Sequence, residues 1–182
     1  MSIPELFADL GIPLDYGRSP RRPSYADARE LEAIEPNIIG KMQRLAPETA
    51  RAWRAMKQAA AQSGVELLLV SGFRSVSHQT ELFRKKLAAG QSIDAILKVN
   101  AAPGFSEHHT GRAVDIATPG TRPLTAEFEA SAAFVWLRQN AAAFGFGMPY
   151  GRDNAFGFEF EPWHWSQLGA QSRRRGEATV SV

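Results

Sequence analysis

Two short segments concentrate residue types that can bind a metal ion. One reads Ser-Glu-His-His-Thr-Gly-Arg-Ala-Val-Asp and contains His108 and Asp115, and the other reads Glu-Pro-Trp-His-Trp and contains Glu161 and His164. Zinc favours imidazole and carboxylate ligands, and a hydrolytic zinc takes three protein ligands and leaves a fourth position for water. His108, Asp115 and His164 would supply that set. Glu161 would be the remaining carboxylate, which accepts a proton from the water.

The same residues also allow a purely structural interpretation. A histidine beside a carboxylate is usually a hydrogen-bonded surface or core residue, and Trp-His-Trp could be an aromatic edge strand. Short motifs match by chance, so spacing alone leaves the two interpretations about equally weighted. Of the other two histidines, His78 falls early in an expected helix and His109 follows His108 in a loop. Both are predicted to be structural or to support neighbouring site residues.

The segment from 113 to 117 is predicted to be a strand that carries Asp115. Val114 and Ile116 lie on one face of such a strand and Asp115 lies on the other. The carboxylate can therefore leave the core and meet His108, which a loop would carry.

The second segment contains a strand breaker between its two polar residues. Glu161 and His164 are three residues apart and would face opposite sides of a regular strand. Pro162 interrupts strand pairing and suits a bend that brings both side chains to one side. Trp163 and Trp165 would then pack on the opposite face.

The remaining pattern mixes helices and strands without a regular alternation, which favours a single α+β domain. The predicted helices cover 47–63, 77–89 with Ser77 as the cap, 92–99 and 130–144. The other predicted strands cover 65–70 and 156–160, the second from the alternation of Phe with Gly and Glu.

Composition excludes several classes of protein. With 182 residues, 44% hydrophobic and 22% charged, the chain suits one globular domain rather than a disordered or coiled-coil chain. It has no cysteine, so disulfides and cysteine-based zinc sites are excluded. The net charge of +2 is too small to indicate a nucleic-acid partner.

Membrane and export signals are also missing from the sequence as written. No stretch reaches the roughly 18 apolar residues of a membrane span. The N-terminus lacks a basic start followed by an apolar run, so it is not predicted to be a secretory signal. The compartment is left open by the sequence: the chain is cytoplasmic as written, and it acts at the cell envelope if a leader was removed or another export route is used. The sequence predicts no oligomeric state.

Three motifs in order carry a resemblance to a known family. Residues 106–115 fit the pattern Ser-x-His-x-x-Gly-x-Ala-x-Asp, the sequence Glu-Pro-Trp-His ends at His164, and Ser-Gly-Phe-Arg-Ser occupies 71–75. Together they resemble the zinc D-alanyl-D-alanine carboxypeptidases of the VanY type. The resemblance implies a Hedgehog/D,D-peptidase-like fold, a single α+β domain with a small, mostly antiparallel sheet flanked by helices. It implies a zinc carboxypeptidase domain at 40–169, and the composition of the flanking segments predicts an N-terminal arm of uncertain structure at 1–39 and a basic flexible tail at 170–182.

The resemblance also implies roles for individual residues. His108, Asp115 and His164 would bind one zinc ion, and Glu161 would be the general base. Arg74 would be catalytic, holding a substrate oxygen either as a carboxylate clamp or as support for the oxyanion.

Three further positions concern the substrate. By the same resemblance, Gln79 and Ser106 would bind the terminal end of the substrate. Phe73 stands where many family members have Tyr, which removes one hydroxyl contact.

The activity implied is hydrolysis of the C-terminal D-alanine from peptidoglycan stem peptides or muropeptides, at a D,D or an L,D bond. Two alternatives keep the fold: a peptidoglycan endopeptidase or lysin, and a zinc-containing peptidoglycan-binding module without turnover. A third, a nucleic-acid or envelope tether based on the arginines near both ends, ranks low because those arginines lack interleaved aromatic residues.

Overall fold

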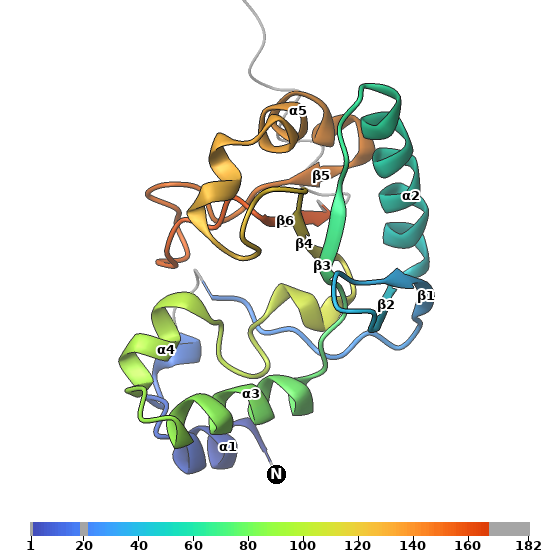
Figure 1. Cartoon of the computed structure of the whole chain (residues 1–182). Helices are drawn as coiled ribbons and strands as arrows, with labels where there is room; N and C mark the ends of the chain where they lie inside the picture. The colour runs from blue at the N-terminus through green and yellow to red at the C-terminus, as the bar shows by residue number, and fades with distance from the viewer. Residues whose placement is uncertain (1, 19–21, 168–182) are drawn as a thin grey trace, which may run out of the picture.

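A four-stranded antiparallel sheet lies at the centre of the protein (Figure 1). The computed structural model describes residues 2–18 and 22–167. The sheet has the order β3 (Leu68–Ser71), β4 (Ala113–Ala117), β6 (His164–Gln167) and β5 (Phe146–Gly147). A separate antiparallel hairpin is made of β1 (Glu32–Pro36) and β2 (Met42–Leu45). The expected small antiparallel sheet is confirmed.

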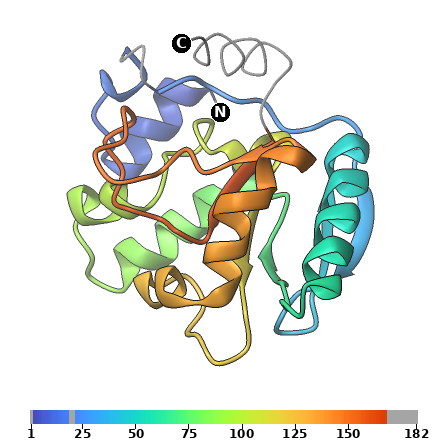
Figure 2. The same cartoon turned by 90° about the horizontal axis from the view of Figure 1, so that it is seen from above.

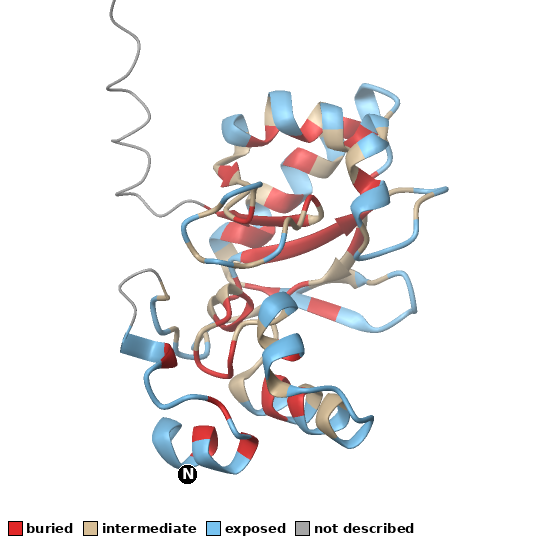
Figure 3. Ribbon diagram, turned by 90° about the vertical axis from the view of Figure 1, so that its left-hand side faces the viewer, coloured by how far each residue is buried: buried red, intermediate tan, exposed pale blue. Residues whose placement is uncertain are grey.

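The main core lies between one face of this sheet and the helices that cover it. These are α2 (Pro47–Gln62) and α5 (Ala132–Asn140), with the short 3-10 segments η3 (Ala126–Ala130) and η4 (Ala141–Phe144) flanking α5. Trp53 and Met56 of α2 are fully buried and belong to one cluster with Val114 and Ile116 of β4 and with Trp165 of β6. Figure 3 shows this interior as the larger buried region.

A second, smaller core is built by the helices below the sheet. It joins α1 (Ile3–Leu10) to α3 (Val76–Ala88) and α4 (Ile93–Val99), with η1 (Tyr16–Arg18) beside them. Its buried side chains are mainly Leu6, Phe7, Leu10, Phe83 and Ile96. In Figures 1 and 2, α1 and α2 lie at opposite sides of the molecule.

The N-terminal segment is more ordered than the expected arm. Helix α1 packs into the second core, and β1 pairs with β2. The predicted boundary between residues 39 and 40 falls inside the turn of this hairpin, where the Asn37 amide donates to the Lys41 carbonyl at 2.9 Å. Of the predicted basic tail at 170–182, nothing lies within the described residues.

Most predicted helices are found, with local corrections. The helix starting near residue 77 begins at Val76, because Ser75 rather than Ser77 caps it by accepting from the His78 amide. The helix expected over 130–144 begins at Ala132, because Ser131 caps it by accepting from the Phe134 amide, and it ends at Asn140, where η4 follows. Among the described helices, none is long and apolar enough to cross a membrane.

The strand predicted over 156–160 is wrong. This segment has the expected alternation of exposure but no strand partner. Gly157 has φ +74°, and the Asn154 side chain bonds the backbone of Phe156 and Phe158. The alternation arises because Phe156 and Phe158 pack edge-on against Tyr150 while the intervening residues face solvent.

Candidate active site

Strand pairing places two of the predicted metal ligands side by side. Asp115 of β4 lies directly opposite His164, the first residue of β6. Their neighbours Val114 and Trp165 form the adjacent pair and point into the main core. Side chains alternate along a strand, so Asp115 and His164 share the opposite face. Hydrophobic packing on one face therefore fixes the register that joins them.

A short 3-10 segment brings the third residue to the same place. His108 lies in η2 (Glu107–Thr110), which ends at Gly111 with φ +66°. A Cβ atom at Gly111 would lie 2.8 Å from the backbone nitrogen of Ala46. Glycine therefore permits both the left-handed turn and the close approach of the chain, which returns directly into β4.

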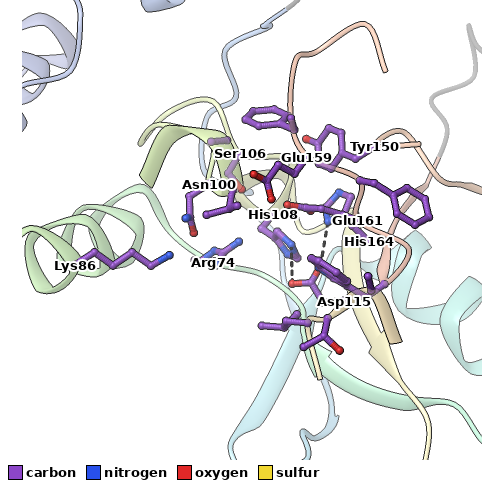
Figure 4. Close-up of a pocket in the computed structure, with 18 residues that line it drawn as sticks. Arg74, Lys86, Asn100, Ser106, His108, Asp115, Tyr150, Glu159, Glu161 and His164 are labelled. Atoms are coloured by element: carbon purple, nitrogen blue, oxygen red, sulfur yellow. Dashed lines mark hydrogen bonds and ion pairs between the residues drawn. The ribbon is translucent and has the colours of Figure 1, made fainter. Parts of the chain in front are cut away.

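The three side chains form a compact group with the chemistry of a zinc site. His108 Nε2 lies 3.2 Å from Asp115 Oδ2, and His164 Nδ1 lies 3.1 Å from Asp115 Oδ1 (Figure 4). One potential ligand atom from each residue falls within 4.8 Å of the others, and all three residues are buried. Two imidazoles and a carboxylate are a donor set that zinc accepts. The residues present therefore fit the metal that the sequence predicted.

A backbone contact sets which nitrogen of His108 is available. His108 Nδ1 lies 2.7 Å from the Gly72 carbonyl, which can only accept, so Nδ1 donates to it and Nε2, which faces Asp115, is the nitrogen left for a metal ion. Burial lowers the pKa of His108, which favours the neutral form. Gly72 is required here because a Cβ atom would lie 2.8 Å from the Arg44 carbonyl oxygen.

His164 lies between two carboxylates. Its Nδ1 faces Asp115, and its Nε2 lies 2.9 Å from Glu107 Oε2. Burial acts to lower the pKa of His164, but the hydrogen bonds to Asp115 and Glu107 outweigh it and raise the pKa to about 10. Burial also acts to raise the pKa of Asp115, and His108 and His164 together bring it far below its usual range. Without a metal, His164 is thus protonated, and metal binding must release that proton.

Glu107 and Tyr150 are site residues that the sequence analysis missed. Glu107 holds the far nitrogen of His164, and the Tyr150 ring stacks on the His164 ring at 4.6 Å between centroids and 21° between planes. Glu107 could have been recognised as a site residue because it directly precedes His108 in the histidine motif. Tyr150 lies in a segment with no motif, and only the folded chain brings it over His164.

Glu161 enters the site from the turn before β6. The His164 amide donates to the Glu161 carbonyl at 3.1 Å, and this turn places both side chains on one cavity of about 540 Å³, as the Pro162 bend predicted. The two tryptophans differ in burial, however. Trp165 is buried in the main core, whereas Trp163 packs against that core while also lining the cavity. The expectation that both pack on the opposite face is confirmed for Trp165 and only in part for Trp163.

The pKa of Glu161 is suited to proton transfer near neutral pH. Burial raises the pKa of Glu161 to about 7, an effect that His164 and Arg74 partly oppose and the carboxylate of Asp115 reinforces. A carboxylate with this pKa can both accept and return a proton.

Arg74 lines the same cavity, and hydrogen bonds hold its backbone on both sides. Its amide donates to the His108 carbonyl, and its own carbonyl accepts from His109 Nδ1 at 2.6 Å. His109 is fully buried, and its Nε2 accepts from the Gly104 amide, so it has the structural role predicted for it. The Arg74 side chain lines the cavity, and its Nε atom has no partner among the described residues.

The predicted substrate-binding residues are placed differently from one another. Ser106 lines the cavity, whereas Gln79 lies behind the wall and donates through Nε2 to the carbonyl of Ala101, which does line it. Direct contact of Gln79 with substrate stays a prediction. Phe73 lines a neighbouring pocket rather than this cavity.

Comparison with known proteins identifies the family. Residues 42–170 match the family model described as VanY: D-alanyl-D-alanine carboxypeptidase. The protein YodJ of Bacillus subtilis (strain 168) is 34% identical over 146 residues, which cover 79% of this chain and 51% of YodJ. The chain spans about half the length of the first curated relatives it matches.

Two solved structures are similar over most of the described fold. The LdcB LD-carboxypeptidase, described for its peptidoglycan recognition, superposes with a TM-score of 0.72 at 30% identity, covering 84% of this chain and 74% of LdcB. The vancomycin-resistance D,D-pentapeptidase VanY in complex with Zn(II) gives a TM-score of 0.63 at 29% identity, covering 84% and 85%. With the fold, the motifs and the buried His-Asp-His group in agreement, this chain belongs to the VanY family of D-alanyl-D-alanine carboxypeptidases.

Proposed function

We propose that this protein is a zinc-dependent carboxypeptidase that removes the C-terminal D-alanine of peptidoglycan stem peptides. The observation that carries the proposal is the opening of the His108–Asp115–His164 group and Glu161 onto one cavity. The zinc ion of the related VanY structure supports the choice of metal. The peptidoglycan recognition described for LdcB supports the class of substrate.

The proposed chemistry is hydrolysis of a peptide bond. A zinc ion held by His108, Asp115 and His164 would supply a Lewis acid and lower the pKa of water. Glu161 would take the proton of the attacking water and return it to the leaving amine, as its raised pKa allows. Glu107 would hold the His164 ring through Nε2 and leave Nδ1, which faces Asp115, to bind the metal.

Arg74 would hold a substrate oxygen. Its guanidinium presents paired donors that suit a carboxylate or the charge that develops on the scissile carbonyl oxygen. The hydrogen bonds of the Arg74 amide and carbonyl fix the position of its Cα atom. Less conformational freedom is therefore lost when substrate binds.

A product assay tests the proposal. Zinc-loaded protein is incubated with muropeptides that carry tetrapeptide or pentapeptide stems, with and without chelator, and products are read by mass spectrometry. Loss of one alanine that chelator abolishes supports the carboxypeptidase, and the stem that shortens first identifies an L,D or a D,D bond. Cleavage inside the stem would instead support an endopeptidase. Absence of any cleavage with zinc bound would support a binding module.

A further inference from the structure

A short segment that follows η1 joins two loops that line the cavity. This segment, residues 22–28, lies before the region that the family model matches. The first loop, residues 104–109, carries His108, and the second loop, residues 150–161, carries Glu161. Because the proposed hydrolysis uses one residue from each loop, whatever holds the two loops together bears on the geometry of the reaction.

Backbone hydrogen bonds hold the 22–28 segment against the first loop. The Tyr25 amide donates to the Gly104 carbonyl and the Ala28 amide donates to the His109 carbonyl, both at 2.7 Å. Between these two bonds, the Asp27 carboxylate accepts at 2.8 Å from the first amide of α3. The loop of the first proposed ligand and the start of α3 therefore give the segment a fixed base.

Arg22 extends from the same segment to the second loop. Its Nε atom donates to the Phe156 carbonyl at 3.3 Å. Its guanidinium carbon lies over the Tyr16 ring at 4.3 Å from the centroid and over the Phe158 ring at 5.8 Å. A guanidinium is attracted to the faces of aromatic rings at such distances. Arg22 thus ties the outer part of the second loop to η1.

The second loop connects this contact to the proposed catalytic group. Phe156 and Phe158 pack edge-on against the Tyr150 ring, at 5.6 and 5.0 Å between centroids. The Tyr150 ring stacks on His164, and the Tyr150 carbonyl accepts from the Glu161 amide at 3.0 Å. Figure 4 shows Tyr150, Glu161 and His164 gathered together. Because His164 is also held by the pairing of β6 with β4, a shift of the loop should displace Glu161 more than His164.

We propose that the 22–28 segment is a positioning element of the active site, and that Arg22 positions Glu161 through the second loop. This inference rests on the proposed function, since the position of Glu161 matters only if it transfers a proton. Arg22 lines a neighbouring pocket rather than the cavity, so it acts on the reaction through the loop and not by contact with substrate. Misplacement of a reacting group by about 1 Å can lower a rate about 100-fold.

Steady-state kinetics of zinc-loaded Arg22→Met tests the positioning role. Methionine keeps an unbranched apolar side chain but has neither the charge nor the donor. With the muropeptide that the parent protein cleaves, kcat should fall at least about tenfold while KM changes by less than about threefold. The variant should retain a full equivalent of zinc and a melting temperature similar to that of the parent. Arg22→Lys should recover part of kcat, because an ammonium is also attracted to the two rings.

Arg29→Met is the matched control, because it removes the same charge from an exposed position just after the segment. It should leave kcat and KM unchanged. Loss of zinc or a large fall in melting temperature in Arg22→Met would show a general structural role. A rise in KM at constant kcat would show that the loop contacts substrate without positioning Glu161. Either result, or kinetics equal to those of the parent, overturns the inference.

Hydrogen exchange tests the same contact without any need for turnover. In Arg22→Met, the amides of residues 150–161 should exchange at least about fivefold faster than in the parent, whereas those of β4 and β6 should be unchanged. Unchanged exchange in residues 150–161 would overturn the inference. Absence of hydrolysis by the parent in the product assay would refute the proposed function and leave this exchange measurement open, so the two failures are distinguishable.

Discussion

The two ends of the cavity are built in different ways. At the metal end, Asp115 and His164 are a cross-strand pair. Their neighbours Val114 and Trp165 pack into the main core on the other face of the sheet, and this packing places the pair. At the cationic end, which is lined by Arg74 and Lys86, Arg74 follows a strand and Lys86 extends from α3, which is held by the second core. Asp115 and His164 are therefore held by the sheet, whereas the position of Lys86 depends on how the smaller core packs.

The difference suggests a division of tasks between the two ends. Chemistry at a metal requires ligands held within a few tenths of an ångström, which paired strands provide. Recognition of a flexible peptide end would tolerate more movement, which the long side chain of Lys86 on a separate helix provides. The following predictions test whether the two ends are separable.

The largest effect is expected for Asp115→Ala. It removes the carboxylate that contacts both imidazoles, at 3.2 and 3.1 Å. We expect stoichiometric zinc binding to be lost and turnover to fall by about 10³-fold or more, as for loss of a catalytic metal. Metal content after dialysis, measured by atomic absorption, checks the first point. Retention of a full equivalent of zinc would exclude Asp115 as a ligand.

Glu161→Gln should separate catalysis from metal binding. The amide has nearly the same shape but cannot accept a proton, so turnover should fall about 10²- to 10⁴-fold while zinc is retained. Glu159→Gln is the matched control, since Glu159 lines the same cavity two residues earlier. We expect that control to keep turnover within about tenfold. Comparable losses in the two variants would mean that cavity charge, rather than a specific base, is responsible.

Phe7→Ala should act on the cationic end alone. Phe7 is buried and packs against the rings of Tyr16 and Phe105. Its truncation should cost about 3–5 kcal/mol in the second core. Native-state hydrogen exchange should then become faster in α3 and α4 but remain unchanged in β4 and β6. Uniformly faster exchange would show that the two cores unfold as one unit.

The raised pKa of Glu161 predicts a pH-dependent stability of the metal-free protein. Because folding raises this pKa from 4.5 to about 7, the folded state favours the protonated carboxyl. The native state is therefore penalised as pH rises through this range, by up to about 3 kcal/mol above pH 7. Glu161→Gln should raise the melting temperature in chelator at pH 8 and have little effect at pH 4. Equal melting temperatures of variant and parent at pH 8 would contradict it.

The smallest effect is expected for Glu107→Gln. The substitution weakens the hydrogen bond to His164 Nε2 but leaves all three metal ligands. Loss of such an outer hydrogen bond usually lowers metal affinity about 10- to 100-fold. Competition with a chromogenic chelator measures it. An unchanged zinc affinity would mean that strand pairing and Tyr150 stacking already orient the ring.

Much of the metal end could be predicted from the sequence. The alternation of Val114, Asp115 and Ile116 gave the strand and its polar face, and Pro162 gave the bend that places Glu161 near His164. These positions of Asp115 and Glu161 could be predicted from motif spacing, because they depend on local periodicity and on the pairing of a single pair of strands.

The cationic end and the outer contacts could not be predicted in the same way. Lys86 and Lys85 are adjacent and chemically identical, and only the packing of Phe83 decides which one lines the cavity. The Phe156–Phe160 alternation was mistaken for a strand because aromatic packing on Tyr150 produces the same period of exposure.

The sequence by itself predicted the candidate metal ligands His108, Asp115 and His164, the proposed general base Glu161 and the mixed helix-and-strand fold, since residue type, motif order and periodicity express them directly. Only the tertiary structure decided that Glu107 and Tyr150 hold His164, that Gln79 lies behind the wall and that Lys86 joins Arg74. Local periodicity fixes which face of an element is apolar. Which polar side chains then meet depends on long-range packing, which no single segment encodes.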